Sequence, residues 1–214
     1  PLEYEKSAGA KELHLDSQGI IWVATQSGLL LLEPLTASTQ LLRSDLHYPY
    51  SLPNNSVWSI FPDPDGGIWV GTYGGKLAYM TFADNGVDYF KATPGGLNHP
   101  IVSCFEEDSE GNLWIGTDKG VCMYSYRQDR FVPLRTVSSE GSVITNKVTF
   151  ITVEPDGRVW MLVNDQGCFA YDIHRGELHE WPYRKIGFSG FRKMLRCVDG
   201  DVWISRYHSN LYHA

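Results

Sequence analysis

The stretch EGNLWIGTDKGV, from Glu110 to Val121, places a tryptophan in a short apolar run between two glycine-containing turns. Similar units are QGIIWVATQSGL, GGIWVGTYGGKL, DGRVWMLVNDQG and DGDVWISRYHSN. Their tryptophans recur 43 to 47 residues apart, at Trp22, Trp69, Trp114, Trp160 and Trp203. Self-similarity at a period in the forties indicates a repeat architecture, in which each repeat is one supersecondary unit.

The first turn of each repeat carries a glycine three residues before the tryptophan, at Gly19, Gly66, Gly111, Gly157 and Gly200. Four repeats also have an acidic residue six positions before it, at Asp16, Asp63, Asp108 and Glu154. A carboxylate can accept hydrogen bonds from backbone N–H groups two residues further on, and glycine supplies a positive φ. We therefore expect hairpin turns in which the acids are structural rather than catalytic or metal-binding.

The tryptophan strand is apolar on both sides of the ring, as in Ile68–Trp69–Val70. Three successive bulky apolar residues predict a strand that is buried on both faces. We expect a strand before it at 56–61, 101–106 and 147–153, a strand directly after it, and a polar fourth strand at 87–92, 130–135 and 177–182. Four antiparallel strands per period describe a propeller blade, with the tryptophan as the core residue between blades.

The predicted fold is therefore all-β, a single β-propeller or propeller fragment over residues 1–214. The opening PLEYE resembles the fourth strand of a blade, and the closing NLYHA resembles a third strand. These ends fit a ring of five blades closed by a shared blade, and they equally fit a longer propeller cut within a blade. We favour the excised piece of a longer protein.

Composition excludes several classes of protein. The formal net charge is −7, from 18 basic and 25 acidic side chains, and no basic stripe occurs. Binding to nucleic acid and contact with an anionic membrane are therefore not expected for this segment. The four cysteines, Cys104, Cys122, Cys168 and Cys197, form no metal-ligand spacing, so we expect buried thiols, no metal and no cofactor.

Two copies of the repeat carry a specific resemblance: DPDGGIWVGTYGGKLAYM and DSEGNLWIGTDKGVCMYSYRQDRF. Both resemble the two-component regulator propeller repeat, and the resemblance extends over essentially the whole chain. The last two copies depart from the pattern, because Val163 and Arg206 replace the usual threonine and Ser209 stands where glycine is expected.

The resemblance implies a periplasmic sensor region of a hybrid two-component histidine kinase, of the kind found in gut Bacteroidetes. It implies an oligosaccharide as the signal, a homodimer formed through the parent receptor, and no catalysis in this segment. Family sensor propellers usually have seven blades, so this chain would be part of one.

The variable loops are the place to seek a site. In a propeller, the loops from second to third strand share one face with the loops between blades. Aromatic rings beside amides and charges there suit sugars, because rings stack on C–H faces and polar groups read hydroxyls. The candidate ligand-binding residues are Tyr73, Asp118, Lys119, Asn164, Asp165, Arg206, Tyr207 and His208.

Two further tryptophans lie outside the repeat position. Trp58 is expected to fill the central channel or to contact a ligand at its mouth. Trp181 ends a fourth strand at the outer rim, where it packs on the blade edge or serves an interface with another protein.

Catalytic signatures are missing from the sequence, which has no G-x-S-x-G elbow, HExxH helix or phosphate loop.

Three hypotheses follow. The first is a sensor module that binds an oligosaccharide, or relays its binding, without catalysis. The second is a scaffold that only dimerises the receptor. The third is a propeller enzyme acting on polysaccharide.

Overall fold

The computed structural model describes residues 9–48, 50–63, 66–74, 76–81, 86–134, 136–138, 141–181, 190–197, 201–206 and 211–213. Within these ranges the single helical element is one 3-10 turn, η1 (Tyr126–Gln128), so the fold is all-β as predicted. The described ranges contain no helix that could cross a membrane. The chain divides into two compact units, Pro1–Ala92 with Pro100–Val102 and Thr93–His99 with Ser103–Ala214.

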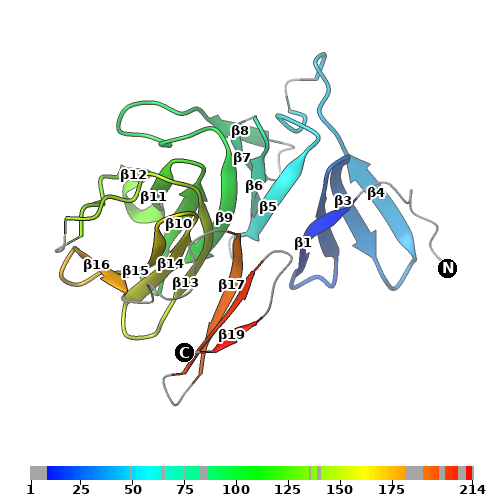
Figure 1. Ribbon diagram of the computed structural model, residues 1–214. Coiled ribbons are helices and arrows are strands. Elements are labelled where there is room, and N and C mark those ends of the chain that lie inside the picture. The colour runs from blue at the N-terminus through cyan, green and yellow to red at the C-terminus, as the bar shows by residue number, and fades with distance from the viewer. Residues whose placement is uncertain are drawn as a thin grey trace. The chain divides into compact units, whose positions relative to one another are not determined.

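The first unit holds two four-stranded antiparallel sheets, whose strands follow one another in chain order (Figure 1). The first sheet, drawn in blue, comprises β1 (Ala10–Leu15), β2 (Ile21–Thr25), β3 (Gly28–Glu33) and β4 (Ser38–Leu42). The second comprises β5 (Val57–Pro62), β6 (Gly67–Thr72), β7 (Leu77–Thr81) and β8 (Gly86–Phe90).

The second unit holds three antiparallel sheets. The first comprises β9 (Val102–Glu107), β10 (Asn112–Thr117), β11 (Gly120–Ser125) and β12 (Arg130–Val132). The second comprises β13 (Val148–Val153), β14 (Arg158–Val163), β15 (Gly167–Asp172) and β16 (Glu177–Trp181). The third has three strands among the described residues: β17 (Phe191–Arg196), β18 (Val202–Arg206) and β19 (Tyr212–His213).

The predicted strands are confirmed to within a few residues, and each repeat forms one blade. The expected third strand at the end of the chain is confirmed at Tyr212–His213, which pairs with β18. The expected strand at residues 1–5 lies outside the described residues. The first strands β1, β5, β13 and β17 shift register near their start, for example between Val57 and Ser59. A bulge at this point adds twist to the blade.

The tryptophan strands lie in the core, as the sequence predicts. Every described residue of β6 and β10 is buried. Trp22, Trp69, Trp114 and Trp160 expose 1–4% of their surface. Trp114 packs on Tyr171 of β15 in the neighbouring sheet, with ring centroids 5.3 Å apart. Within the second unit the tryptophan therefore fills the space between adjacent blades.

The acidic residue of the first turn has a structural role, which confirms the prediction and adds to it. Asp108 accepts hydrogen bonds from the backbone N–H groups of Glu110 and Asn112, at 3.0 and 2.9 Å. Its other oxygen accepts one from the indole Nε1 of Trp114, at 2.9 Å. Asp16 binds Trp22 in the same way, at 2.8 Å. One carboxylate thus shapes the turn and satisfies the polar atom of the core tryptophan.

The fourth blade replaces this contact. Glu154 stands at the acidic position, and both of its carboxylate oxygens accept from Arg196 Nη1 of β17, at 2.8 and 2.6 Å. The indole Nε1 of Trp160 is buried without a hydrogen-bond partner among the described residues. The longer side chain is used to join two neighbouring sheets instead of binding the indole.

The fifth tryptophan departs from the prediction. Trp203 is only partly buried, whereas we expected it in the core with the other four. Its ring stacks on His213 of β19, at 4.3 Å between centroids. The His213 ring in turn bonds the Asp201 carboxylate, at 2.6 Å. Trp203 therefore packs mainly on a polar side chain of its own sheet.

The small residue two positions after the tryptophan has a steric cause. A Cβ on Gly116 would lie 2.4 Å from Cys104 Sγ and 3.1 Å from a methyl carbon of Val148 in the next sheet. In the first unit, a Cβ on Gly71 would lie 2.4 Å from Ser59 Oγ. The first strands approach too closely at these points for a side chain.

Candidate functional site

The loops that join one blade to the next are held onto the loops between second and third strands. Asn98 donates from Nδ2 to the carbonyl of Lys119, at 2.9 Å, and its Oδ1 accepts from the Thr117 hydroxyl. Gln166 accepts from the N–H groups of Thr145 and Asn146, both at 2.9 Å. Within the second unit the two kinds of loop therefore lie together, as the propeller prediction requires, and they form an ordered surface.

Four of the candidate residues belong to these loops in the second unit. Asp118 forms an ion pair with Lys147, at 3.1 Å, and each side chain exposes about a quarter of its surface. The N–H of Asn164 donates to the Lys147 carbonyl, at 2.8 Å. Asp118 and Asn164 therefore both lie beside Lys147. Asp118 contacts it through its side chain, and Asn164 contacts it through its backbone N–H. Lys119 and Asp165 are exposed, and Asp165 has a left-handed backbone with φ of 59°.

Three candidates come from the last repeat. Arg206 lies at the end of β18, where it donates to the Tyr212 hydroxyl at 3.3 Å. Its guanidinium also lies 5.8 Å from the Phe191 ring centroid. Tyr207 and His208 lie outside the described residues.

Tyr73 has the most distinctive surroundings, in the first unit. Its ring stacks on that of Trp58 of β5, with centroids 5.8 Å apart and planes inclined by 25°. The ammonium of Lys11 on β1 lies 3.9 Å from the Trp58 centroid, within cation–π distance. Lys11 and the Trp58 indole both donate to Ser56 Oγ, at 3.3 and 3.2 Å. We call Lys11, Trp58 and Tyr73 the aromatic stack.

The aromatic stack has an open end. Tyr73 exposes 53% of its surface, whereas Trp58 is half-buried. The N–H of Tyr73 donates to the carbonyl of Ser56, at 2.9 Å, which fixes the loop beneath the ring. A rigid ring with one face in solvent can bind the C–H face of a sugar at little cost in side-chain entropy.

The described residues offer few groups for metal binding or for nucleophilic catalysis by a thiolate. They contain no cluster of three His, Cys, Asp or Glu side chains that could hold a metal ion. Burial raises the pKa of the Cys122 and Cys168 thiols to about 12, so neither is a thiolate nucleophile near neutral pH. Both are buried, as predicted, while Cys104 and Cys197 are partly exposed.

Comparison with known families identifies the repeat. Residues 51–74 and 96–119 match the model of the family described as two component regulator propeller. Two of the five repeats therefore match this family. The matched segments are equivalent parts of two consecutive blades, each ending in the loop that follows the tryptophan strand. The first segment contains Trp58 and Tyr73, and the second contains Asp118 and Lys119.

Several solved structures share the propeller fold. The extracellular domain of BT4673 from B. thetaiotaomicron, described as a hybrid two component system, is 20% identical over 99% of this chain and 36% of that one, with a TM-score of 0.62. The extracellular domain of BT3049 from the same organism, described likewise, is 20% identical over 99% of this chain and 35% of that one, with a TM-score of 0.55.

A third structure comes from another system. PorZ of Porphyromonas gingivalis, a surface component of the type-IX secretion system, is 14% identical over 92% of this chain and 30% of that one, with a TM-score of 0.68. At these identities the likeness shows the fold alone. The chain spans about a third of the length of these solved structures. A comparison with curated proteins returns no match.

Two residues in contact with Trp58, Lys11 and Ser56, were not predicted from the sequence. Lys11 lies in the first repeat, 47 residues before Trp58, so its place over the ring depends on how the two blades pack. Ser56 has no distinguishing pattern around it. The one available signal was Trp58 itself, an aromatic outside the repeat position.

Proposed function

We propose that this chain is a ligand-binding sensor module in the extracytoplasmic part of a two-component receptor, and that its signal is an oligosaccharide. Two observations support the proposal: the chain carries repeats of the two component regulator propeller family, and similar folds occur in proteins described as extracellular domains of hybrid two component systems.

The observation that supports a sugar as the ligand is the aromatic stack. Tyr73 offers an exposed ring face, Trp58 supports it from behind, and the Lys11 ammonium keeps the stack polar at one end. Sugars present apolar C–H faces and many hydroxyls, which rings and adjacent polar groups recognise together. In the second unit, the Asp118 side chain pairs with Lys147, and Asn164 contacts Lys147 through its backbone N–H.

The remaining parts of the proposal concern the parent protein. The receptor lies in the inner membrane with this segment in the periplasm, dimerises through its other domains, and resembles a hybrid sensor histidine kinase. This segment binds its ligand without turnover and requires no cofactor.

Titration calorimetry tests the ligand site. The chain is titrated with plant, host and microbial oligosaccharides, and the best ligand is titrated again into Tyr73→Ala and Tyr73→Phe variants. Loss of the ring is expected to weaken binding about tenfold, since one aromatic contact contributes roughly 1 kcal/mol beyond its buried area. Tyr73→Phe keeps the ring and retains most of the affinity. Equal affinity of the wild-type and alanine proteins would exclude the aromatic stack as the site.

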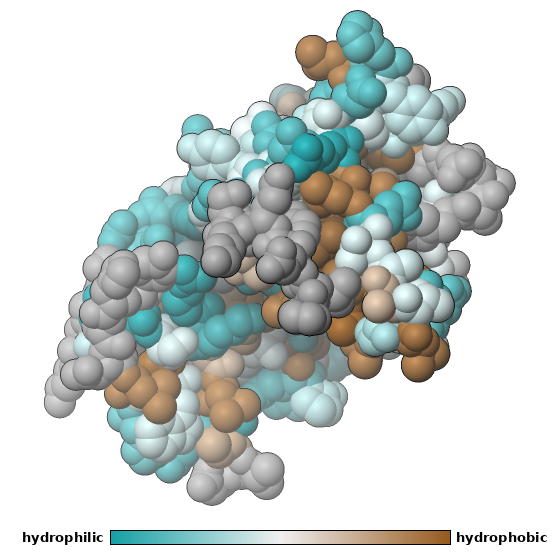
Figure 2. Space-filling view, turned by 90° about the vertical axis from the view of Figure 1, so that its right-hand side faces the viewer, coloured by the Kyte–Doolittle hydropathy of each residue, from teal (hydrophilic) through white to brown (hydrophobic). Residues whose placement is uncertain are grey.

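An assembly role is the second candidate, and exposed leucines favour it. Leu13 and Leu15 on β1 expose 65% and 63% of their surfaces. Figure 2 shows hydrophobic side chains at the surface among hydrophilic ones. Light scattering distinguishes this role: an assembly scaffold forms dimers that Leu13→Ser/Leu15→Ser disrupts, whereas a chain that is monomeric at all concentrations is no scaffold by itself.

A further inference from the structure

A hollow in the first unit is lined mainly by residues 42–48 and 50–52, which lead from β4 to β5. Its volume is about 610 Å³, within the range of ordinary ligand pockets. Leu42 of β4, Leu52 and Met80 of β7 contribute apolar atoms to its lining. Leu52 and Met80 are buried, at 1% and 7% exposure, so they give the hollow a firm apolar base.

The loop is held in shape by its own hydrogen bonds. The N–H of Asp45 donates to Ser51 Oγ at 2.8 Å, and the same hydroxyl donates back to the Asp45 carbonyl at 2.9 Å. The N–H of Ser44 donates to Asn55 Oδ1, at 2.7 Å. The Tyr89 hydroxyl of β8 donates to the Ser51 carbonyl, which ties the loop to the second sheet. The hollow is therefore largely formed before any ligand arrives, which lowers the entropy lost on binding.

Two aromatic rings line the hollow. Tyr48 and Tyr50 lie edge to face, with centroids 5.8 Å apart and planes inclined by 73°. They expose 50% and 52% of their surfaces. Because the rings are nearly perpendicular, they present ring surface in two directions around one space. Such a corner suits a small, thick ring with C–H groups on its faces better than a flat aromatic ligand.

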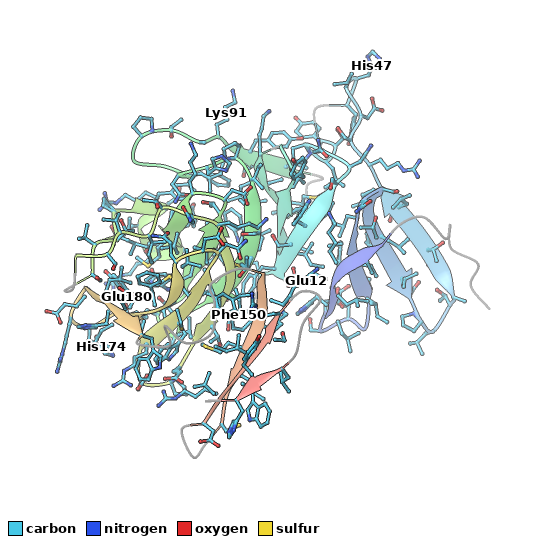
Figure 3. All side chains as sticks on the ribbon, viewed as in Figure 1. Glu12, His47, Lys91, Phe150, His174 and Glu180 are labelled. Atoms are coloured by element: carbon cyan, nitrogen blue, oxygen red, sulfur yellow. The ribbon has the colours of Figure 1, made fainter. Side chains whose placement is uncertain are left out.

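Polar groups surround the rings. Arg43 uses its Nε to donate to the Ser27 carbonyl, at 3.2 Å, which leaves its two terminal nitrogens available. Asp45 accepts from the N–H of His47 at Oδ1, at 2.8 Å, and keeps its second oxygen available. His47 stands at the outer tip of the loop (Figure 3). One guanidinium and one carboxylate balance in charge, so the lining favours an uncharged ligand rich in hydroxyls.

We propose that this hollow, the loop pocket, binds one uncharged pyranose unit of an oligosaccharide. Tyr48 and Tyr50 contact the C–H faces of the sugar, and Arg43 and Asp45 bind its hydroxyls. The proposal rests on the proposed function, since it names a site and a sugar class for the same signal. It also concerns residues that the sequence pattern did not single out one by one.

Calorimetry and amide hydrogen exchange of the chain test the loop pocket together. The neutral probes are cellohexaose, mannohexaose, xylohexaose, maltohexaose and galactohexaose, and the charged probes are a hexagalacturonate and a heparin hexasaccharide. The variants are Tyr48→Ala/Tyr50→Ala, which removes both rings, and Tyr48→Phe/Tyr50→Phe, which keeps them. Leu35→Ala serves as the matched control, because Leu35 is 97% exposed in the turn between β3 and β4.

The loop pocket predicts that at least one neutral probe protects amides of residues 43–52 from exchange. The dissociation constant then rises about tenfold or more in Tyr48→Ala/Tyr50→Ala and stays within about threefold of wild type in the phenylalanine variant and in Leu35→Ala. Thermal melting checks that each variant is folded. If the alanine variant is not folded, the phenylalanine variant keeps the test valid.

Other outcomes overturn the loop pocket in distinguishable ways. Binding that survives in Tyr48→Ala/Tyr50→Ala but is lost in Tyr73→Ala would leave the proposed function standing and refute the loop pocket. Protection of residues 43–52 by the charged probes alone would refute the uncharged class. Failure of every probe to bind wild-type protein would count against both proposals.

Discussion

At the scale of single residues, the acidic position of the repeat is the most informative. Asp108 is 5% exposed and accepts from two backbone N–H groups and the Trp114 indole. The sequence predicted the turn and its structural acid, because both follow from local backbone chemistry. The bond to the indole was not predicted, since it depends on where a buried ring points.

Asp108→Ala is expected to lower the free energy of unfolding by about 3–5 kcal/mol, because it leaves the buried indole and turn N–H groups without an acceptor. Asp156→Ala is the matched control, since the Asp156 side chain is 53% exposed and accepts one turn bond at 3.2 Å. That change is expected to cost less than about 1 kcal/mol. Urea denaturation measures both, and equal stability of the two variants would refute the role given to Asp108.

Asp16 makes one turn sensitive to pH. Burial by itself raises the pKa of Asp16, but hydrogen bonds from the Trp22 indole and from the Ile20 and Gln18 N–H groups outweigh it, so the pKa is lowered. The carboxylate therefore contributes stability that is fully present above about pH 4 and is lost as pH falls through the lowered pKa. Asp16→Asn is expected to be less stable near neutral pH and to lose less stability on acidification. Melting curves between pH 2 and 6 test this, and parallel pH profiles of the two proteins would contradict it.

At the scale of elements, small residues in the strands of a blade determine how closely neighbouring strands can approach. The sequence predicted the four-strand unit from period, turns and apolar runs. The need for glycine at position 116 could not be predicted from the sequence. The atoms that leave no room for a side chain there, Cys104 Sγ and a Val148 methyl, come from two other strands. Close approach between elements is a tertiary property that local patterns do not record.

Gly116→Ala is expected to destabilise the protein by about 1–3 kcal/mol, since the added methyl overfills the contact between first strands. Gly9→Ala is the control, because no heavy atom lies within 4 Å of its Cβ position and its φ is not positive. Chemical denaturation gives both values. A Gly116→Ala protein as stable as the control would show that the sheets yield easily at this point.

The candidate residues also differ in their contacts with other elements. Asp118 and Asn164 were predicted as ligand contacts from their loops; the Asp118 side chain forms an ion pair with Lys147, whereas Asn164 contacts Lys147 only through its backbone. Tyr73 was predicted for the same reason; it stacks on Trp58 and exposes 53% of its surface. Loop position alone does not separate the two cases, because the difference lies in partners from other parts of the chain. Tyr48 and Tyr50 were not predicted, since the hollow that they line also needs Met80 of β7, from another part of the chain.

At the scale of the whole molecule, the tryptophan repeats and the exposed loop aromatics support one proposal: that the chain binds an oligosaccharide and does not consume it. The fold could be predicted from the sequence because five tryptophan units repeat the same local rules. The ligand could not, because loops are free to vary while blades keep their packing.

A thermal-shift screen of the chain against plant, host and microbial oligosaccharides tests this claim most directly, with new reducing ends measured in the same samples. A ligand at 100 times its dissociation constant is expected to stabilise the folded state by roughly 2.7 kcal/mol, which raises Tm by about 6 °C for a chain of this size. At least one oligosaccharide is expected to give such a shift, with no new reducing ends. No shift across the panel would contradict binding by this chain, and release of reducing ends would show an enzyme instead of a sensor.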